Sequence, residues 1–157
     1  DNTVLEVRSI AWSPVDNRIA FVGRDLSNSS FAAAPAGLYL IKGDGSGLTP
    51  WIKATFASIG PLAWSPGGEH IAFTADNDLW ILTRASPEPR PIVRGLSAEP
   101  NGCTFVPWFI WLSDGKRLAY NTDRDGPIMI HAVTINGRDD RVLKSAPPTY
   151  LVLPRGC

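Results

Sequence analysis

Hydrophobic and polar residues follow one pattern that the chain repeats three times. In each copy a short apolar segment ends in tryptophan, a polar turn follows, and a second segment alternates large apolar residues with alanine. The copies are centred on Trp12, Trp64 and Trp111, which are 52 and 47 residues apart. Alternation with period two predicts β-strands, and self-similarity at this spacing is typical of propellers and solenoids.

The second segment of each copy has two distinct faces. Large residues occupy one face, and the other face carries an alanine at the same position in every copy. The large residues are Ile19, Phe21, Ile71, Phe73, Leu118 and Tyr120, and the alanines are Ala20, Ala72 and Ala119. Both faces are therefore expected to be buried between stacked sheets, with the alanine allowing the neighbouring sheet to approach closely.

Two more apolar segments complete each copy, so four short antiparallel strands are expected in every 40 to 50 residues, as in a propeller blade. The predicted fold class is all-β, with three four-stranded antiparallel blades. Residues 1–8 are expected to lead in as an outer strand. The expected boundaries within one domain are blade one at 9–53, blade two at 54–94, a linker at 95–107, blade three at 108–144 and a tail at 145–157.

Four strings carry a family resemblance: WSPVDNRIAFVG, GLYLIKGDGSGLT, WSPGGEHIAFTAD and LSDGKRLAYNTDRDG. They resemble the WD40-like PD40 repeats of TolB-type β-propellers. Such repeats occur in periplasmic scaffold proteins, in propeller domains attached to peptidases and in bacterial sensor ectodomains. The resemblance therefore implies architecture far more than activity.

Chain length complicates this interpretation, because propellers have about four to eight blades and 157 residues encode three copies. We expect either a segment of a longer propeller or a ring that a second copy completes, in preference to a closed three-blade monomer. An open stack is the third arrangement. Because the chain begins at Asp1 rather than Met, a leader or a larger flanking region is expected to have been removed.

Composition and motifs exclude several function classes. Fifteen basic and fifteen acidic residues give zero net charge, without the basic stripe of a nucleic-acid-binding protein. No apolar run reaches the roughly 18 residues of a membrane span, so no membrane insertion is expected. His70 and His131 have no motif partner, and no P-loop, G-x-G-x-x-G, G-x-S-x-G or H-E-x-x-H motif occurs. We expect no catalytic residues, no cofactor and no metal site.

The two cysteines, Cys103 and Cys157, lie outside the strand pattern. They form either one disulfide, which would indicate an oxidising compartment, or two unrelated thiols. Metal binding by two cysteines without a nearby histidine is not expected.

Candidate binding residues lie outside the repeat positions. Trp51 and Trp108 are aromatic residues of the type that dominates contact surfaces. Arg24 and Phe31 belong to an insertion at residues 24–36. Asp123 and Asp125 lie in a turn that resembles the start of a calcium loop but favours an ordinary hairpin turn, since the distal glutamate is missing.

The leading hypothesis is a non-enzymatic module that binds a protein or peptide, exported from a bacterial cytoplasm to the periplasm or the cell exterior. The contacts are expected from loops at one end of the blades. Two alternatives remain: the propeller segment of a serine peptidase whose catalytic domain is absent, and a sensor or carbohydrate-binding ectodomain that uses Trp51 and Trp108.

Overall fold

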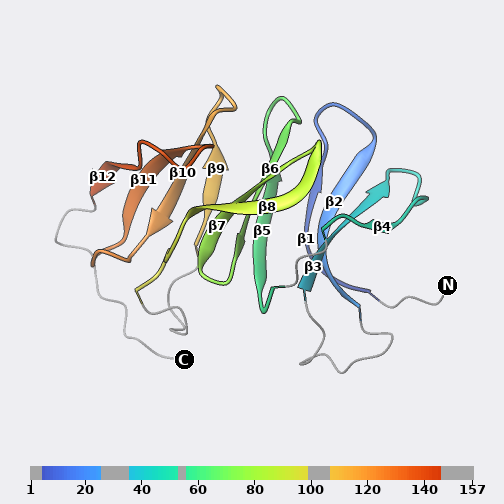
Figure 1. Cartoon of the computed structure of the whole chain (residues 1–157), viewed down its shortest axis with the longest axis horizontal. Helices are drawn as coiled ribbons and strands as arrows, with labels where there is room; N and C mark the ends of the chain where they lie inside the picture. Colours follow the sequence, from blue (N-terminus) through green and yellow to red (C-terminus); the bar gives the residue numbers. More distant parts are fainter. Residues whose placement is uncertain (1–4, 26–35, 53–55, 99–106, 146–157) are drawn as a thin grey trace. The chain divides into compact units, whose positions relative to one another are not determined.

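The computed structural model describes residues 5–25, 36–52, 56–98 and 107–145, which form three four-stranded antiparallel sheets (Figure 1). Blade one contains β1 (Leu5–Trp12), β2 (Arg18–Asp25), β3 (Ala36–Lys42) and β4 (Thr49–Pro50). Blade two contains β5 (Ile59–Trp64), β6 (His70–Ala75), β7 (Asp78–Thr83) and β8 (Ser86–Val93). Blade three contains β9 (Phe109–Trp111), β10 (Arg117–Thr122), β11 (Met129–Thr134) and β12 (Arg141–Ser145).

The strands follow one another in each sheet in chain order, so every blade is an antiparallel meander. The predicted all-β fold class with three four-stranded antiparallel sheets is confirmed. Within the described ranges, no helix is long and apolar enough to cross a membrane.

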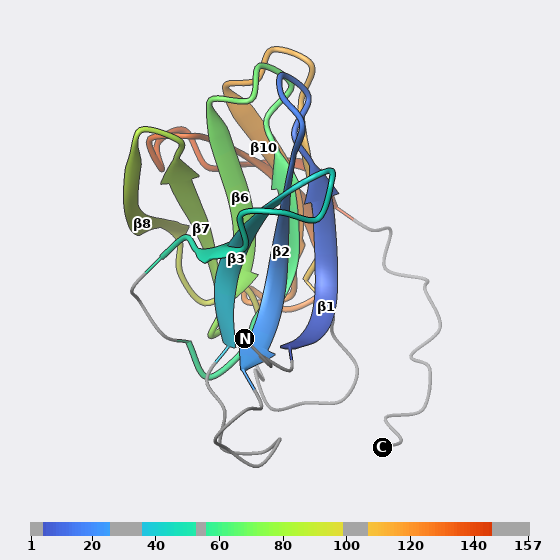
Figure 2. The ribbon, with the colours of Figure 1, turned by 90° about the vertical axis from the view of Figure 1, so that its right-hand side faces the viewer.

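Blade one starts earlier than the sequence pattern indicates. Its first strand begins at Leu5, and Figure 2 shows this strand beside β2, with β3 on the other side of β2. The register of β1 against β2 shifts between Val7 and Ser9. This bulge interrupts the alternation of apolar and polar positions, which is why residues 5–8 look like a separate lead-in strand in the sequence.

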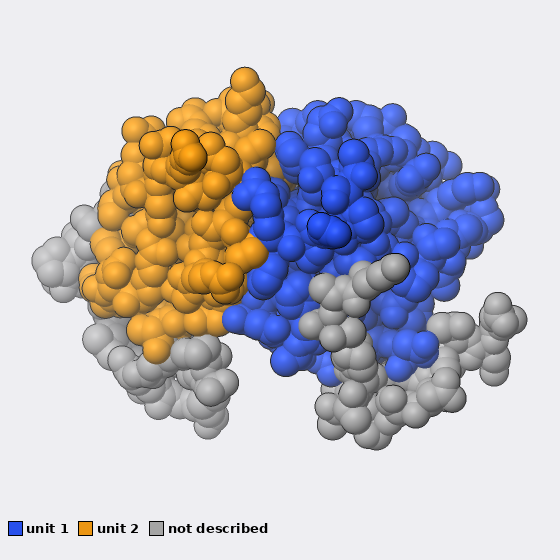
Figure 3. Space-filling view, viewed as in Figure 1, with its two compact units in different colours: residues 1–76, 80–90 blue, residues 77–79, 91–157 orange. Residues whose placement is uncertain are grey.

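Contacts group the chain into two compact units (Figure 3). Residues 1–76 and 80–90 form the first unit, which contains blade one and most of blade two. Residues 77–79 and 91–157 form the second, which contains blade three and one end of blade two.

Strand register repeats from blade to blade. Trp12 lies opposite Ile19, Trp64 opposite Ile71, and Trp111 opposite Leu118. Each blade also has a ring pair between its second and third strands. The pairs are Phe21 with Tyr39 at 5.4 Å between centroids, Phe73 with Trp80 at 6.4 Å, and Tyr120 with His131 at 5.5 Å.

In the first unit, two sheets pack face to face. The side of blade one that carries Ala11 and Ala20, its alanine face, packs against the side of blade two that carries Leu62 and Trp64, its tryptophan face. Ala20, Val22 and Leu38 belong to the same hydrophobic cluster as Trp64 and Phe73. The Trp64 indole N–H donates a hydrogen bond to the Ala11 carbonyl oxygen at 3.2 Å. A small side chain at the facing position allows this close approach, as the sequence predicts.

Both faces of β6 are buried, since Ile71, Ala72 and Phe73 have no exposed surface. Trp12 does not share this burial: its side chain is 58% exposed, against 9% for Trp64 at the equivalent position. Trp12 is therefore not a core residue of blade one, although it has the repeat position of Trp64.

Gly68 gives the first testable prediction. It has a φ of +68°, and a Cβ atom there would lie 2.5 Å from the Val15 Cγ2 atom of blade one. Replacing Gly68 with alanine is expected to lower the free energy of unfolding by roughly 1–3 kcal/mol, because left-handed backbone strain and overlap act together.

The neighbouring Gly67 is the matched control. A Cβ atom at Gly67 meets nothing within 4 Å, so Gly67→Ala is expected to change stability by about 0.5 kcal/mol or less. Urea unfolding of both variants measures the difference. Equal losses from the two would contradict the close approach of Gly68 to Val15.

Candidate functional site

An exposed apolar surface lies on blade three. Trp108 is 62% exposed and Ile110 is 64% exposed, and Ile130 of β11 is also exposed. Ile110 lies opposite Ala119, which in turn lies opposite Ala132, so these residues share one side of the sheet. We call this side the open face of blade three; it comprises the exposed Trp108, Ile110 and Ile130, with the buried Ala119 and Ala132 and the half-buried Asn121 among them.

The opposite side of the same sheet forms the core of the blade. Phe109, Leu118, Tyr120 and Val133 are all buried. The strands alternate sides at every residue, so Trp108, Ile110 and Ile130 share the other side of the sheet.

The open face has a repeat equivalent in the first unit. Ile110 and Ala119 lie opposite each other, as Ala11 and Ala20 do in blade one. Ala20 is fully buried, because the tryptophan face of blade two packs on it. The open face is thus the alanine face of blade three. It has the same strand register as the face of blade one that packs against blade two.

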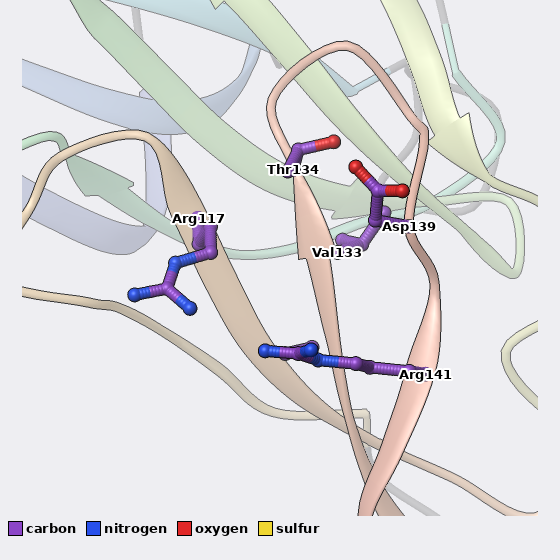
Figure 4. A pocket seen from close by; sticks show the side chains of 6 residues that line it. Arg117, Val133, Thr134, Asp139 and Arg141 are labelled. Carbon is purple, nitrogen blue, oxygen red and sulfur yellow. The ribbon is translucent and has the colours of Figure 1, made fainter.

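A hollow with two arginines lies at the end of β10 that begins with Arg117 (Figure 4). Its volume is about 170 Å³, and Arg117, Thr134, Asp139 and Arg141 line it together with Ala132 and Val133. Arg141 lies opposite the small Ala132, and Arg117 forms an ion pair with Asp114 at 2.7 Å. Guanidinium groups suit a carboxylate partner, because they donate hydrogen bonds in a planar fork.

Asp140 is the centre of a polar network that ties blade three together. Its carboxylate accepts hydrogen bonds from the Tyr120 hydroxyl at 2.8 Å and from Arg124 Nη2 at 2.7 Å. The His131 Nδ1 atom lies 3.1 Å from it. The network joins β10, β11 and the turn before β12, so its role is structural.

Electrostatics in this network favour a charged Asp140 and a neutral Tyr120. Burial acts to raise the pKa of Asp140, but hydrogen bonds from Arg124, Tyr120 and His131 outweigh it and hold the pKa below 3.8. Burial, followed by the hydrogen bond to Asp140, raises the pKa of Tyr120 far above its ordinary value of 10.0.

His131 shows what the sequence-based reasoning missed. Only 4% of it is exposed, and its Nε2 atom is buried with no hydrogen-bond partner in the part of the chain that is described. No sequence motif links His131 to Asp140. The signal was its repeat position, since His131 occupies the place of Tyr39 and Trp80 in the ring pairs.

The acidic turn residues form hydrogen bonds or ion pairs within the protein. An Asp123 carboxylate oxygen accepts a hydrogen bond from the Ala98 backbone N–H at 3.0 Å, and Asp125 pairs with Arg124 at 3.2 Å. Within the described ranges, no three His, Cys, Asp or Glu residues are grouped so as to hold a metal ion.

Two other predicted contact residues lie in the first unit. Trp51 stacks on Trp64 with 5.3 Å between ring centroids, so part of its ring surface is used in packing. The Arg24 guanidinium donates to the Ala57 carbonyl oxygen at 3.2 Å. Trp108, Asp123 and Asp125 lie in the second unit. Phe31, Cys103 and Cys157 lie outside the described residues.

No family model matches the sequence, and no curated protein matches it. Solved structures do match. TolB from Acinetobacter baumannii is 20% identical with a TM-score of 0.65, over 90% of this chain and 33% of that one. A puromycin-hydrolyzing peptidase from Mycobacterium tuberculosis is 18% identical with a TM-score of 0.68, over 90% and 24%.

The β-propeller domain of the trilobed protease from Pyrococcus furiosus also matches, with 12% identity and a TM-score of 0.61 over 87% of this chain and 41% of that one. The chain thus spans less than half of each of these three structures. Its three four-stranded antiparallel sheets match part of a β-propeller fold.

Proposed function

We propose that this chain is a non-enzymatic interaction module that binds a protein through the open face of blade three. The observation that carries the proposal is the exposure of Trp108 and Ile110 beside Ile130 on one side of a sheet. Exposed apolar surface of this kind marks interaction sites, and tryptophan is enriched among binding hot spots.

The arginine hollow suggests the chemistry of the partner. A protein with an apolar contact region flanked by a carboxylate would cover the open face and place its acidic group near Arg117 and Arg141. Such charges set orientation and specificity more than affinity. An exported bacterial location is part of the proposal and is supported by the resemblance of the repeats to those of TolB-type proteins.

Site-specific crosslinking tests this function. We expect a photoreactive phenylalanine analogue at position 108, in cells that produce the protein naturally, to give a discrete adduct with one protein. Ile110→Asp in the same chain should reduce that adduct at least tenfold, because a charge at the centre of the apolar surface must be desolvated on binding.

Position 88 provides the control for the probe. Glu88 is an exposed residue of β8 in blade two and is not part of the open face. The same probe there should give no discrete adduct. Equal labelling from positions 108 and 88, or an adduct at 108 that Ile110→Asp does not reduce, would contradict the proposed function.

A second candidate is the propeller portion of a peptidase. It is favoured by the fold, since two of the structures described above belong to a peptidase and a protease. Determining the complete coding sequence tests it: a serine hydrolase domain in the same polypeptide would support this candidate, and its absence would remove it.

A further inference from the structure

The packing of blade one on blade two shows how two of these blades join. The tryptophan face of blade two contributes Trp64, whose indole N–H donates to the Ala11 carbonyl oxygen on the alanine face of blade one. Trp51 follows the last strand of blade one and stacks on the Trp64 ring. The joint therefore has two unlike halves, a tryptophan face and an alanine face.

Blade one presents an unused tryptophan half. Ile10 and Trp12 lie opposite Phe21 and Ile19, as Leu62 and Trp64 lie opposite Phe73 and Ile71. Leu62 and Trp64 are buried, whereas Ile10 is 67% exposed and Trp12 is also mostly exposed. Large apolar residues in the same register are thus left uncovered by any sheet among the described residues.

Blade three presents an unused alanine half, which is the open face. Ile110 stands where Ala11 accepts the indole hydrogen bond. Leu143 follows Val142, which lies opposite His131, as Trp51 follows Pro50, which lies opposite Tyr39. The strand register shifts here, between Ile130 and His131, and Leu143 is exposed.

Charged residues also lie at the edge of the joint. In the first unit, Arg84 comes from the turn after the third strand of blade two and pairs with Asp16, which precedes the second strand of blade one. The turn after the third strand of blade one carries Asp44 instead. The second strand of blade three begins at Arg117, which pairs with Asp114 and lies beside Arg141 in the hollow.

We propose that the partner of the open face is a second copy of this chain, which docks its blade-one tryptophan face there. This inference rests on the proposed function, because it names the occupant of the same surface. The Trp12 indole would donate to the Ile110 carbonyl oxygen, Ile10 would be covered, and Asp44 would approach Arg117. The contact is head-to-tail, so each copy uses two different surfaces.

A second copy is favoured over an unrelated partner because this chain carries both halves of the joint, the tryptophan face on blade one and the alanine face on blade three.

A pair of matched variants tests the inference. Ile10→Asp breaks the tryptophan half, and Ile110→Asp breaks the alanine half; both isoleucines are about two-thirds exposed, so folding is expected to persist. Light scattering at concentrations up to about 100 μM should show the unmodified chain associating, and each variant should associate at least tenfold more weakly.

Mixing the two variants is the decisive step. Each keeps the half that the other lacks, so the mixture should form a one-to-one pair while neither variant associates alone. A monomeric unmodified chain, association that survives either substitution, or a mixture that stays monomeric would overturn the inference. Ile10→Ser and Ile110→Ser serve as the pair if circular dichroism shows that an aspartate variant is unfolded.

The two proposals fail in different ways. If the chain is monomeric while the probe at position 108 still captures a different protein, the second copy is wrong and the interaction module stands. If the probe captures nothing and the chain is monomeric, both are wrong. An adduct of twice the chain's mass that Ile10→Asp abolishes supports both.

Discussion

Replacing Trp64 with alanine is expected to lower the free energy of unfolding by roughly 3–5 kcal/mol, the usual cost of truncating a buried tryptophan. Trp64 is 9% exposed, stacks on Trp51 and lies 5.9 Å from the Arg84 guanidinium. The substitution leaves a cavity between blade one and blade two, and the Ala11 carbonyl oxygen loses its donor. Urea unfolding measures the change.

Trp12→Ala is the matched control, because Trp12 has the same residue type and the same repeat register. Its exposed ring predicts a loss of about 1 kcal/mol or less. The comparison belongs at dilute concentration, since any self-association stabilises the folded chain by mass action. Equal losses from Trp12→Ala and Trp64→Ala would show that burial does not distinguish the two positions.

Replacing Asp140 with alanine is expected to cost about 2–3 kcal/mol, because the buried Tyr120 hydroxyl loses its acceptor and Arg124 loses a charged partner. The side chain of Asp140 is only 27% exposed, so water replaces these contacts poorly. The neighbouring Asp139 is the control. It is exposed, and asparagine tolerates its φ of +56°, so Asp139→Asn should change stability by about 0.5 kcal/mol or less.

The pH dependence gives a second measurement of the same network. Because the pKa of Asp140 is lowered in the folded state, its contribution is present above its ordinary value of 3.8 and is lost as the pH falls through the lowered pKa. The stability difference between the unmodified chain and Asp140→Asn should be constant near neutral pH and should narrow in acid. A difference that stays constant down to pH 2 would contradict the network.

Tyr120 affects the stability of the folded chain at alkaline pH. Its pKa is raised in the folded state, so its contribution is present below the ordinary value of 10.0 and is lost as the pH rises beyond that value. Tyr120→Phe should therefore remove part of the alkaline loss of stability while leaving the acid side largely to Asp140.

The strand pattern could be predicted because its cause is local. Period-two alternation and turn residues fix where each strand starts and ends, and the recurrent Ala20, Ala72 and Ala119 indicate stacked sheets. The exposure of Trp12 could not be predicted in the same way. Its register is that of Trp64, and only the presence or absence of a covering sheet separates the two.

The candidate site was predicted only in part. Trp108 stands out because it lies outside the repeat positions, and it is exposed in the structure. Ile110 and Ile130 were not singled out, since an apolar residue in a strand gives no sign of which side remains uncovered. The Asp140 network joins residues from two strands and a turn, so no spacing along the chain reveals it.

The unlike halves of the joint have a consequence for how such chains can change in length. One blade carries a tryptophan face and an alanine face, so duplicating a blade creates a new interface whose two sides already match their neighbours. Lengthening the chain by whole blades then needs no compensating substitutions. A network such as that of Asp140 and His131 lies inside one blade, so its residues can differ between blades without affecting these interfaces.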